Sequence, residues 1–354
     1  MLELPHAFGA PTARGYIRRQ ASDFYVREEL SFEPGDGGEH LWLYIRKTHW
    51  NTTDLALWLA RAAKLPLRSV GYSGLKDRHA VTEQWFSLHL PGKEDPQWPQ
   101  DMPEGIEIMQ SVRHTRKLNR GTHRFNFFRI CVTDIEPQDE DNFSSRLEKI
   151  QLRGVPNYFG EQRFGRDQNN WLRGSAWLRG EGDAPRKMQL KGIWLSAVRS
   201  GLFNAVLAER VRNDCWDVLL AGDVCQPEGS RGLFNESEEP LAAERVAQGE
   251  VNSTAPMPGV GGVFPSEKCL AMEEAILAPF HAEIAGLERE KVDGLRRSTR
   301  LQVRDLQWSH TENSLTLEFR LPAGAFATSV LAEIVHTSMS PSPVPTEQSS
   351  TLQE

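Results

Sequence analysis

The stretch VPNYFGEQRFG, residues 155–165, marks the point at which the character of this 354-residue chain changes. Before it, residues 24–28 and 41–45 are rich in aromatic and β-branched side chains, which favours strands. After it, residues 195–220 repeat apolar side chains at helical spacing. From Leu301 onward the alternating pattern of strands returns. This order predicts one domain built from both ends of the chain and a mostly helical domain inserted into it.

Three further segments are predicted from local patterns. Thr53 or Asp54 is expected to cap a helix whose apolar face includes Leu55 and Leu59. Residues 225–265 are rich in Pro, Gly and Glu, and they predict a long irregular connection. Residues 266–297 favour helix again.

Length and composition are those of an ordinary globular protein of about two domains. The longest apolar runs are far shorter than the ~20 residues that span a bilayer, so we expect no membrane partner. The N-terminus has no apolar segment behind basic residues, so we expect no secretory signal. The four cysteines form no CxxC pair, which argues against a zinc ribbon or a disulfide framework and favours a reducing cytoplasm.

The charge of the chain is unevenly distributed. A net charge of −7 argues mildly against a nucleic-acid partner. Residues 111–130, however, contain six cations and no acid, and a local basic stripe binds phosphates even on an acidic chain. These cations, called the basic stripe below, are Arg113, Arg116, Lys117, Arg120, Arg124 and Arg129. A solvated loop is the alternative. A second basic wall is a further possibility, made by Arg163, Arg166, Arg173 and Arg179.

The segment GLKDRHAVT, residues 74–82, is the strongest candidate for chemistry. It predicts a glycine-punctuated loop between two strands, with Asp77 flanked by Lys76 and Arg78. An ionised carboxylate in such a loop suits nucleophilic attack or proton abstraction. A solvated surface turn explains the same residues, and the pattern alone favours that interpretation.

Several sequence blocks in a fixed order favour the catalytic interpretation of the Asp77 loop over the solvated turn. Arg18 with DFYVRE (residues 23–28) and GLKDRHAVTEQ (74–84) come first, and VPNYFGEQRFG follows. WLSA (194–197), RSGLFN (199–204) and LPAGAFATS (321–329) complete the set. Through these blocks the chain resembles the TruD family of tRNA pseudouridine synthases. It differs from the family in having Phe125, where a glycine is usual, before Asn126.

The resemblance implies an α+β fold with a catalytic domain that contains a large, mainly antiparallel sheet. This domain would comprise residues 1–151 and 301–337, and a mostly helical α/β TruD domain, residues 152–300, would be inserted into it. The tail, residues 338–354, is rich in Ser, Thr and Pro and is predicted to be disordered.

The resemblance also implies an isomerase that converts uridine 13 of tRNA to pseudouridine. The uracil N1 bond to ribose C1′ is broken and C5 is joined to C1′, so product and substrate contain the same atoms. We therefore expect no cofactor and no metal, in agreement with a sequence that lacks a dinucleotide fingerprint, a P-loop and a metal-ligand cluster. The expected partner is tRNA, and we expect a cytoplasmic monomer.

The family's site residues transfer to five positions. Asp77 would be the catalytic carboxylate, which either attacks C1′ or removes a ribose proton to give a glycal, and Arg18 would hold it by a charge-assisted contact. Phe24 and Phe326 would stack on the flipped uracil and Asn126 would contact it. Core packing for both phenylalanines, and a strand-edge position for Asn126, are the alternatives. The predicted contacts to the RNA backbone are Arg113, Arg116, Lys117, Arg120 and Arg124.

Two other classes of function remain open. A nucleosidase also acts at an anomeric carbon with a carboxylate, but it needs a second carboxyl as general acid. A non-catalytic RNA-binding or chaperone module would explain the basic stripe and would leave the Asp77 loop without a purpose.

Overall fold

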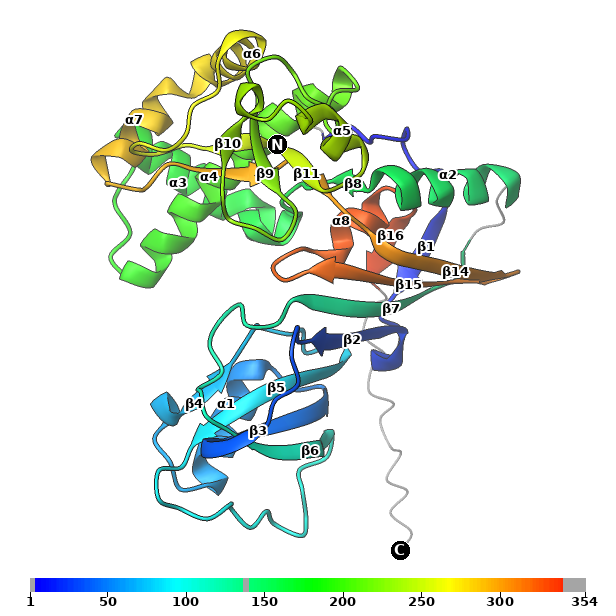
Figure 1. Cartoon of the computed structure of the whole chain (residues 1–354), viewed down its shortest axis with the longest axis vertical. Helices are drawn as coiled ribbons and strands as arrows, with labels where there is room; N and C mark the ends of the chain where they lie inside the picture. The colour runs from blue at the N-terminus through cyan, green and yellow to red at the C-terminus, as the bar shows by residue number, and fades with distance from the viewer. Residues whose placement is uncertain (1–3, 136–139, 340–354) are drawn as a thin grey trace, which may run out of the picture. The chain divides into compact units, whose positions relative to one another are not determined.

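The computed structural model describes residues 4–135 and 140–339 of the chain (Figure 1). These residues form two compact units, each assembled from separate parts of the sequence. The sheet unit contains residues 13–135, 305–324 and 335–339. The helical unit contains residues 4–12, 140–304 and 325–334.

The sheet unit is organised around a ten-stranded sheet whose central path runs β14-β15-β7-β2-β5-β3-β6. Its strands are β1 (Arg14–Ile17), β2 (Phe24–Glu29), β3 (Asp36–Thr48), β4 (Val70–Tyr72), β5 (Val81–His89), β6 (Ile106–His114), β7 (Phe125–Thr133), β14 (Arg304–Thr311), β15 (Ser314–Pro322) and β16 (His336–Met339). Only β2 with β5 and β1 with β16 pair in parallel among the described strands. The predicted large, mainly antiparallel sheet is therefore confirmed.

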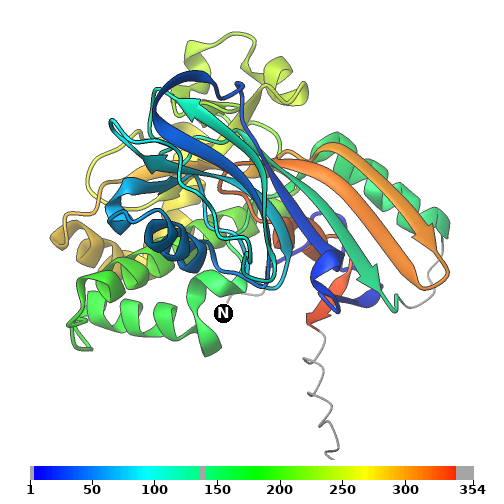
Figure 2. The same ribbon diagram turned by 90° about the horizontal axis from the view of Figure 1, so that it is seen from below.

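Strand β7 has a neighbour along both of its edges in this sheet. It pairs with β15 from Thr133 to Phe125 and with β2 on its other side, as the teal and orange strands of Figure 2 show for the first pair. Burial alternates along β2 and β15, so one face of each strand is covered. Phe125, which replaces a usual glycine, is accommodated as the first residue of this regular strand.

One helix covers part of this sheet. Helix α1 (Thr52–Ala62) buries Leu55 and Leu59 against the strand residues Leu43, Ile45 and Phe86. The predicted helix with this apolar face is confirmed, but its N-cap residue is Asn51, so the predicted cap at Thr53 or Asp54 is wrong. Two short 3₁₀ turns, η1 (Ala21–Asp23) and η2 (Leu67–Ser69), lead into β2 and β4.

The last strand corrects one expectation. Ser338 and Met339 were predicted to begin a disordered tail, but they pair with Tyr16 and Ile17 in β1. Main-chain hydrogen bonds to a strand edge make this pairing, and they need no apolar side chains. The rest of the predicted tail, residues 340–354, lies outside the described residues.

The helical unit combines seven α-helices with short strands in its described part. Its helices are α2 (Glu140–Arg153), α3 (Asn169–Arg179), α4 (Met188–Arg212), α5 (Ala242–Ala247), α6 (Glu267–Leu277), α7 (His281–Arg289) and α8 (Ala327–Ala332). Its strands are β8 (Val155–Pro156), β9 (Val224–Pro227), β10 (Phe234–Asn235), β11 (Val251–Met257), β12 (Leu295–Ser298) and β13 (Arg300–Leu301). The 3₁₀ turns are η3 (Glu161–Phe164), η4 (Arg166–Gln168), η5 (Glu236–Glu238) and η6 (Ala278–Phe280).

The predicted irregular connection over residues 225–265 is wrong. This region supplies β9, β10, α5 and β11, and three of these elements join β12 in a four-stranded sheet. Strand β11 was missed because its buried residues Asn252, Ser253 and Thr254 are polar. Their partners are inside the protein: Arg300 donates to Asn252, and Thr254 donates to the Val224 carbonyl. The helix predicted over 266–297 also ends early, because residues 295–298 form β12.

The compact units follow packing and divide the chain differently from the predicted domains. Helix α2 and the segments 4–12 and 325–334 belong to the helical unit. All of these residues except the end of α2 fall within the predicted catalytic domain, residues 1–151 and 301–337. One residue shows why they pack together: the Arg146 guanidinium of α2 donates to the carbonyls of Gly9 (2.9 Å) and Glu333 (2.8 Å). The assignment of a catalytic and a TruD domain stays a prediction.

A buried ion pair in the helical unit yields a first prediction. The Arg210 and Asp223 side chains are both fully buried and form two hydrogen bonds, and the Leu220 amide adds a third bond to Asp223. Replacing Asp223 by Asn leaves the guanidinium without a counter-charge, so we expect a loss of roughly 3–5 kcal/mol in unfolding free energy. The measurement is thermal or denaturant unfolding. Glu209→Gln, which breaks an exposed pair with Arg212, is the control and should cost less than about 1 kcal/mol. Equal losses in the two variants would refute the importance of the buried pair.

Candidate functional site

Asp77 projects from the loop between β4 and β5, in the sheet unit. Its side chain is 52% exposed, whereas Arg18, its partner, is only 9% exposed. The Arg18 guanidinium donates to Asp77 Oδ2 at 2.5 Å. Arg18 follows β1 directly and has a φ of 61°, a left-handed conformation that is uncommon for a residue with a side chain. The contact predicted between Arg18 and Asp77 is therefore present in the structure.

Phe24 lies beneath the Arg18 guanidinium. The Arg18 Cζ atom is 4.1 Å from the Phe24 ring centroid, which is the geometry of a cation–π contact. The Phe24 ring is 3% exposed and also packs edge-on against Phe128 at 6.3 Å. Phe24 thus supports the cation that holds Asp77, and the ring is largely covered. Direct stacking of Phe24 on a uracil stays a prediction.

Hydrogen bonds from three sides fix the backbone of the Asp77 loop. The Lys47 ammonium donates to the Asp77 carbonyl at 3.1 Å, and Gln84 donates to the Gly74 carbonyl at 3.2 Å. The amide of Lys76 donates to the Thr52 hydroxyl at 2.9 Å. Lys47 is fully buried, and burial lowers its pKa to about 8 even though Asp77 opposes the shift. Residues outside the loop therefore fix its backbone conformation.

A buried polar cluster lies next to this loop. The Lys76 ammonium donates to Glu28 Oε1 and to Asn126 Oδ1, both at 2.8 Å. Burial raises the pKa of the Glu28 carboxyl, and the Lys76 ammonium acts in the opposite direction. His123 contacts the Ser73 hydroxyl at 2.5 Å, and burial followed by the Lys76 charge lowers the His123 pKa to about 4. Asn126, a predicted substrate contact, is thus connected to the Asp77 loop through Lys76.

Gly74 in the motif is required by this cluster. A Cβ atom at Gly74 would lie 3.1 Å from His123 and 3.5 Å from Glu28. The glycine therefore permits the close approach of the loop to buried charges, a reason that the sequence alone could not give.

Sequence reasoning assigned no role to Glu28, Lys47 or His123, and it treated Lys76 only as a cation that flanks Asp77, whereas the Lys76 ammonium contacts Glu28 and Asn126. Glu28 and Lys76 both stand inside the blocks that carry the family resemblance, so their position was a usable signal. Lys47 and His123 have no such signal, because they reach the loop only through the tertiary structure.

Phe326 is the predicted site residue that lies in the helical unit. It is the N-cap residue of α8 and is partly buried against a cluster that contains Tyr158 and Phe159. Four other predicted residues, Arg18, Phe24, Asp77 and Asn126, belong to the sheet unit.

The basic stripe is only partly free of acidic partners. Arg113 pairs with Asp95 at 2.6 Å, which neutralises its charge locally. Lys117 donates to the Arg68 carbonyl, and Arg120 donates to the Tyr72 hydroxyl and stacks on its ring. Arg116 and Arg124 are exposed, and neither forms an ion pair within residues 4–135 and 140–339. Four of the five predicted phosphate contacts therefore keep an uncompensated charge.

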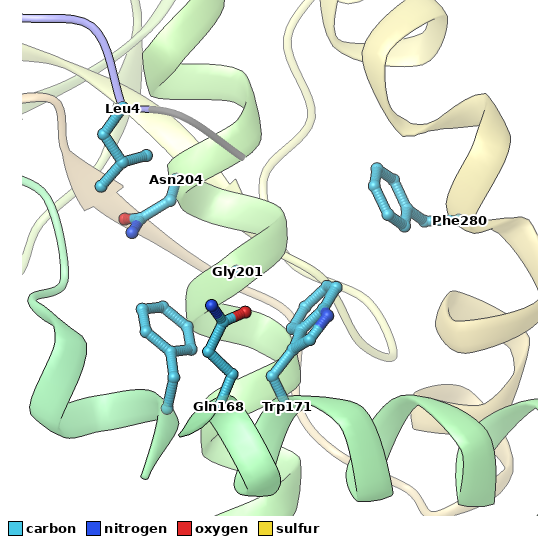
Figure 3. Close-up of a pocket in the computed structure, with 7 residues that line it drawn as sticks. Leu4, Gln168, Trp171, Gly201, Asn204 and Phe280 are labelled. Carbon is cyan, nitrogen blue, oxygen red and sulfur yellow. The ribbon is translucent and has the colours of Figure 1, made fainter. Parts of the chain in front are cut away.

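The helical unit contains an apolar pocket of about 350 Å³, shown in Figure 3. Its lining residues are Leu4, Phe164, Gln168, Trp171, Gly201, Asn204 and Phe280. Trp171 forms one wall of this pocket. The close-up shows the amides of Gln168 and Asn204 on the side of the pocket opposite Phe280.

The described residues contain neither a metal-binding cluster nor a membrane-spanning helix. Within the described residues, no three His, Cys, Asp or Glu side chains come together in a way that could hold a metal ion. No helix in that part of the chain has the length and apolar character needed to cross a membrane.

The low pKa of His123 predicts how stability depends on pH. The imidazole stays neutral in the fold down to about pH 4, whereas the unfolded chain binds the proton near pH 6.5. The contribution of neutral His123 to the free energy of unfolding is therefore complete above pH 6.5 and is lost as the pH falls toward 4. About 2 kcal/mol of this contribution is lost by pH 5. His123→Gln should lose less stability than the wild type between pH 7 and pH 5 in thermal unfolding. Exposed His79→Gln is the control, and an identical pH dependence in all three proteins would contradict the assignment.

Comparisons with known proteins give the family. The model of the family "tRNA pseudouridine synthase D (TruD)" matches residues 5–184 and 184–334. The tRNA pseudouridine synthase D of Aeromonas hydrophila is 43% identical over 337 residues, and the match covers 95% of each chain. The protein of the same name from Aeromonas salmonicida is 42% identical over the same length.

The solved structures agree on the fold. A crystal structure from Methanosarcina mazei, described as a tRNA pseudouridine synthase D (TruD), superposes with a TM-score of 0.72. It covers 93% of this chain and 95% of its own at 20% identity, a level that supports the α+β fold alone. The matches to the family model and to the two Aeromonas proteins span nearly all of the sequence, so the chain belongs to the TruD family of tRNA pseudouridine synthases.

Proposed function

We propose that this protein isomerises uridine 13 of tRNA to pseudouridine and that Asp77 is its catalytic carboxylate. The bond between uracil N1 and ribose C1′ breaks, and a bond between C5 and C1′ forms. N1 gains a proton and C5 loses one, so atoms and electrons balance without a co-reactant. Family membership supports the reaction, and the geometry around Asp77 supports the residue.

The observation that carries this assignment is the contact between Arg18 and Asp77. One carboxylate oxygen accepts a charge-assisted bond at 2.5 Å, while half of the side chain remains open to a substrate. Arg18 is itself immobilised on Phe24, so the carboxylate is oriented before any substrate binds. Such a group suits attack on C1′ and also removal of a ribose proton, and both routes remain open.

Asn126 is suited to contact the uracil because Lys76 fixes its orientation. An ammonium has no acceptor, so the Asn126 atom at 2.8 Å from it must be the amide oxygen. The amide nitrogen is then left to donate to a carbonyl, and uracil offers carbonyl oxygens. Phe326 would hold the flipped base by stacking, which is worth about 1–3 kcal/mol per base in single-strand binders. Phe24 would stack on the base as well once the Arg18 guanidinium moved off its ring.

The nucleosidase alternative requires a second carboxyl that can protonate the leaving base, and Glu28 does not fit that role. Glu28 is the carboxylate closest to the loop through hydrogen bonds, and its side chain is completely buried against Lys76. A buried, paired carboxylate cannot protonate a leaving base from solvent. Product analysis separates the two reactions: the isomerase retains the base, and a nucleosidase releases free uracil.

The decisive experiment maps pseudouridine in tRNA after incubation with the purified protein. Asp77→Asn should abolish product formation, because the amide cannot act as nucleophile or base, while tRNA affinity stays within a few-fold of the wild type. Asp134→Asn is the matched control, because Asp134 is also about half-exposed and pairs with the neighbouring Arg19. Substantial single-turnover product from Asp77→Asn, or loss of activity in Asp134→Asn alone, would overturn the role of Asp77.

The basic stripe predicts the salt dependence of tRNA binding. Arg116→Gln and Arg120→Gln should each weaken binding and lower the slope of log affinity against log salt by about one unit at most. The rate on saturating tRNA should change little, because these side chains would contact the backbone. Arg113→Gln is the control, since Asp95 already neutralises that cation. If all three variants keep the wild-type slope, the stripe is a solvated face.

A further inference from the structure

Two arginines of the helical unit share one aromatic ring. Arg163 comes from η3, within the VPNYFGEQRFG block, and Arg297 comes from β12. Their Cζ atoms lie 5.2 Å and 4.3 Å from the centroid of the Phe159 ring. Arg297 also lies 5.7 Å from the ring of Phe203. Both guanidinium groups therefore lie against the Phe159 ring, and Arg297 also contacts Phe203 of α4.

Neither arginine has an acidic partner among residues 4–135 and 140–339. Arg163 donates to the Ser196 hydroxyl at 3.1 Å, and Arg297 donates to the Asn157 amide oxygen at 2.6 Å. Both acceptors are neutral. The neighbouring Arg296 behaves differently, because it forms an ion pair with Glu273 at 2.5 Å. Two cations without a carboxylate therefore lie on the same ring, beside a cation that is paired.

The two charges destabilise each other. Burial and then the charge of Arg163 lower the Arg297 pKa to about 10, and burial lowers the pKa of Arg163. The Arg297 Nε atom is buried and has no hydrogen-bond partner in the described part of the chain. Two adjacent cations without a counter-charge cost free energy, and a bound anion removes that cost.

The framework around Phe159 is rigid, so the cations are held in place. The side-chain oxygen of Asn204 accepts a hydrogen bond from the backbone N–H of Phe159 at 2.9 Å. The side-chain nitrogen of Asn204 donates to the backbone carbonyl of Phe159, also at 2.9 Å. Phe203 packs edge-on against Phe159 at 5.5 Å. Asn204 is buried and belongs to the central helix α4. A site that is fixed before binding loses little entropy when its ligand arrives.

We propose that Arg163 and Arg297 form a phosphate site that binds a backbone phosphodiester of the RNA substrate. Arg is the side chain best suited to phosphate, because its planar fork donates two parallel hydrogen bonds. The inference rests on the proposed action on tRNA, and it gives a function to the VPNYFGEQRFG block, which the chemistry at Asp77 does not use. The site is separate from the basic stripe, which belongs to the other unit.

A first experiment tests the site without RNA. Inorganic phosphate should raise the melting temperature of the wild-type protein above its value in chloride at equal ionic strength, since a ligand of the folded state stabilises it. This increment should vanish in Arg163→Gln and persist in Arg163→Lys. Without phosphate, Arg163→Gln should melt no lower than the wild type, because it relieves Arg297, whereas a purely structural arginine would lower the melting temperature. Arg245→Gln, which removes a cation that pairs with Glu239 and Glu250, is the control of equal charge.

A second experiment asks whether the anion is RNA. Arg163→Gln should weaken tRNA binding several-fold and lower its log–log salt slope by about one unit, and Arg163→Lys should restore the slope. An equal phosphate increment in wild type and Arg163→Gln would overturn the site itself. A lost increment with an unchanged tRNA slope would overturn the RNA assignment in favour of a free anion. Because both readouts are binding and stability, they remain informative if the protein modifies a different uridine or shows no isomerase activity.

Discussion

The candidate site depends on one buried cation, the ammonium of Lys76. Removing a charge from water costs several kcal/mol, and the fold tolerates it only because Glu28 and Asn126 both accept hydrogen bonds from it. Glu28 lies in β2, Asn126 lies in β7, and Lys76 precedes Asp77 in the loop. The requirement to pair this charge therefore connects two neighbouring strands to the position of the proposed catalytic carboxylate. The half-exposed Asp77 carboxylate therefore lies next in sequence to a member of an almost completely buried ion pair.

The sequence predicted the regular parts of this framework well. Strands β2 and β3 and helix α1 were found because their apolar side chains alternate or recur at the spacing of the element. The contact between Arg18 and Asp77 followed from the family resemblance and is present in the structure. These features depend on local pattern or on motifs that survive in a single sequence.

Other features escaped prediction for physical reasons. Lys76 is 48 residues from Glu28 and 50 from Asn126, so no local pattern connects them. Strand β11 was missed because its interior side chains are polar and find their partners through Arg300 and the Val224 carbonyl. Phe24 was assigned to base stacking by resemblance, and core packing was the favoured interpretation from the pattern; the ring is buried and carries Arg18. Composition indicates where chains are polar, and only the tertiary structure shows which polar groups are satisfied inside.

The parallel pairing of β1 with β16 has a consequence for how the protein is made. Ile17, the residue before Arg18, pairs with Met339, so the strand that leads to the proposed site is completed by a segment more than three hundred residues later. During synthesis the N-terminal part emerges first, and β1 has no partner along this edge until residues 336–339 have emerged. Contacts of such long sequence separation form late, because a large loop must close before they contribute any energy. The strand that leads to the proposed site therefore gains this partner only after residues 336–339 have been made, and a shorter chain would lack it.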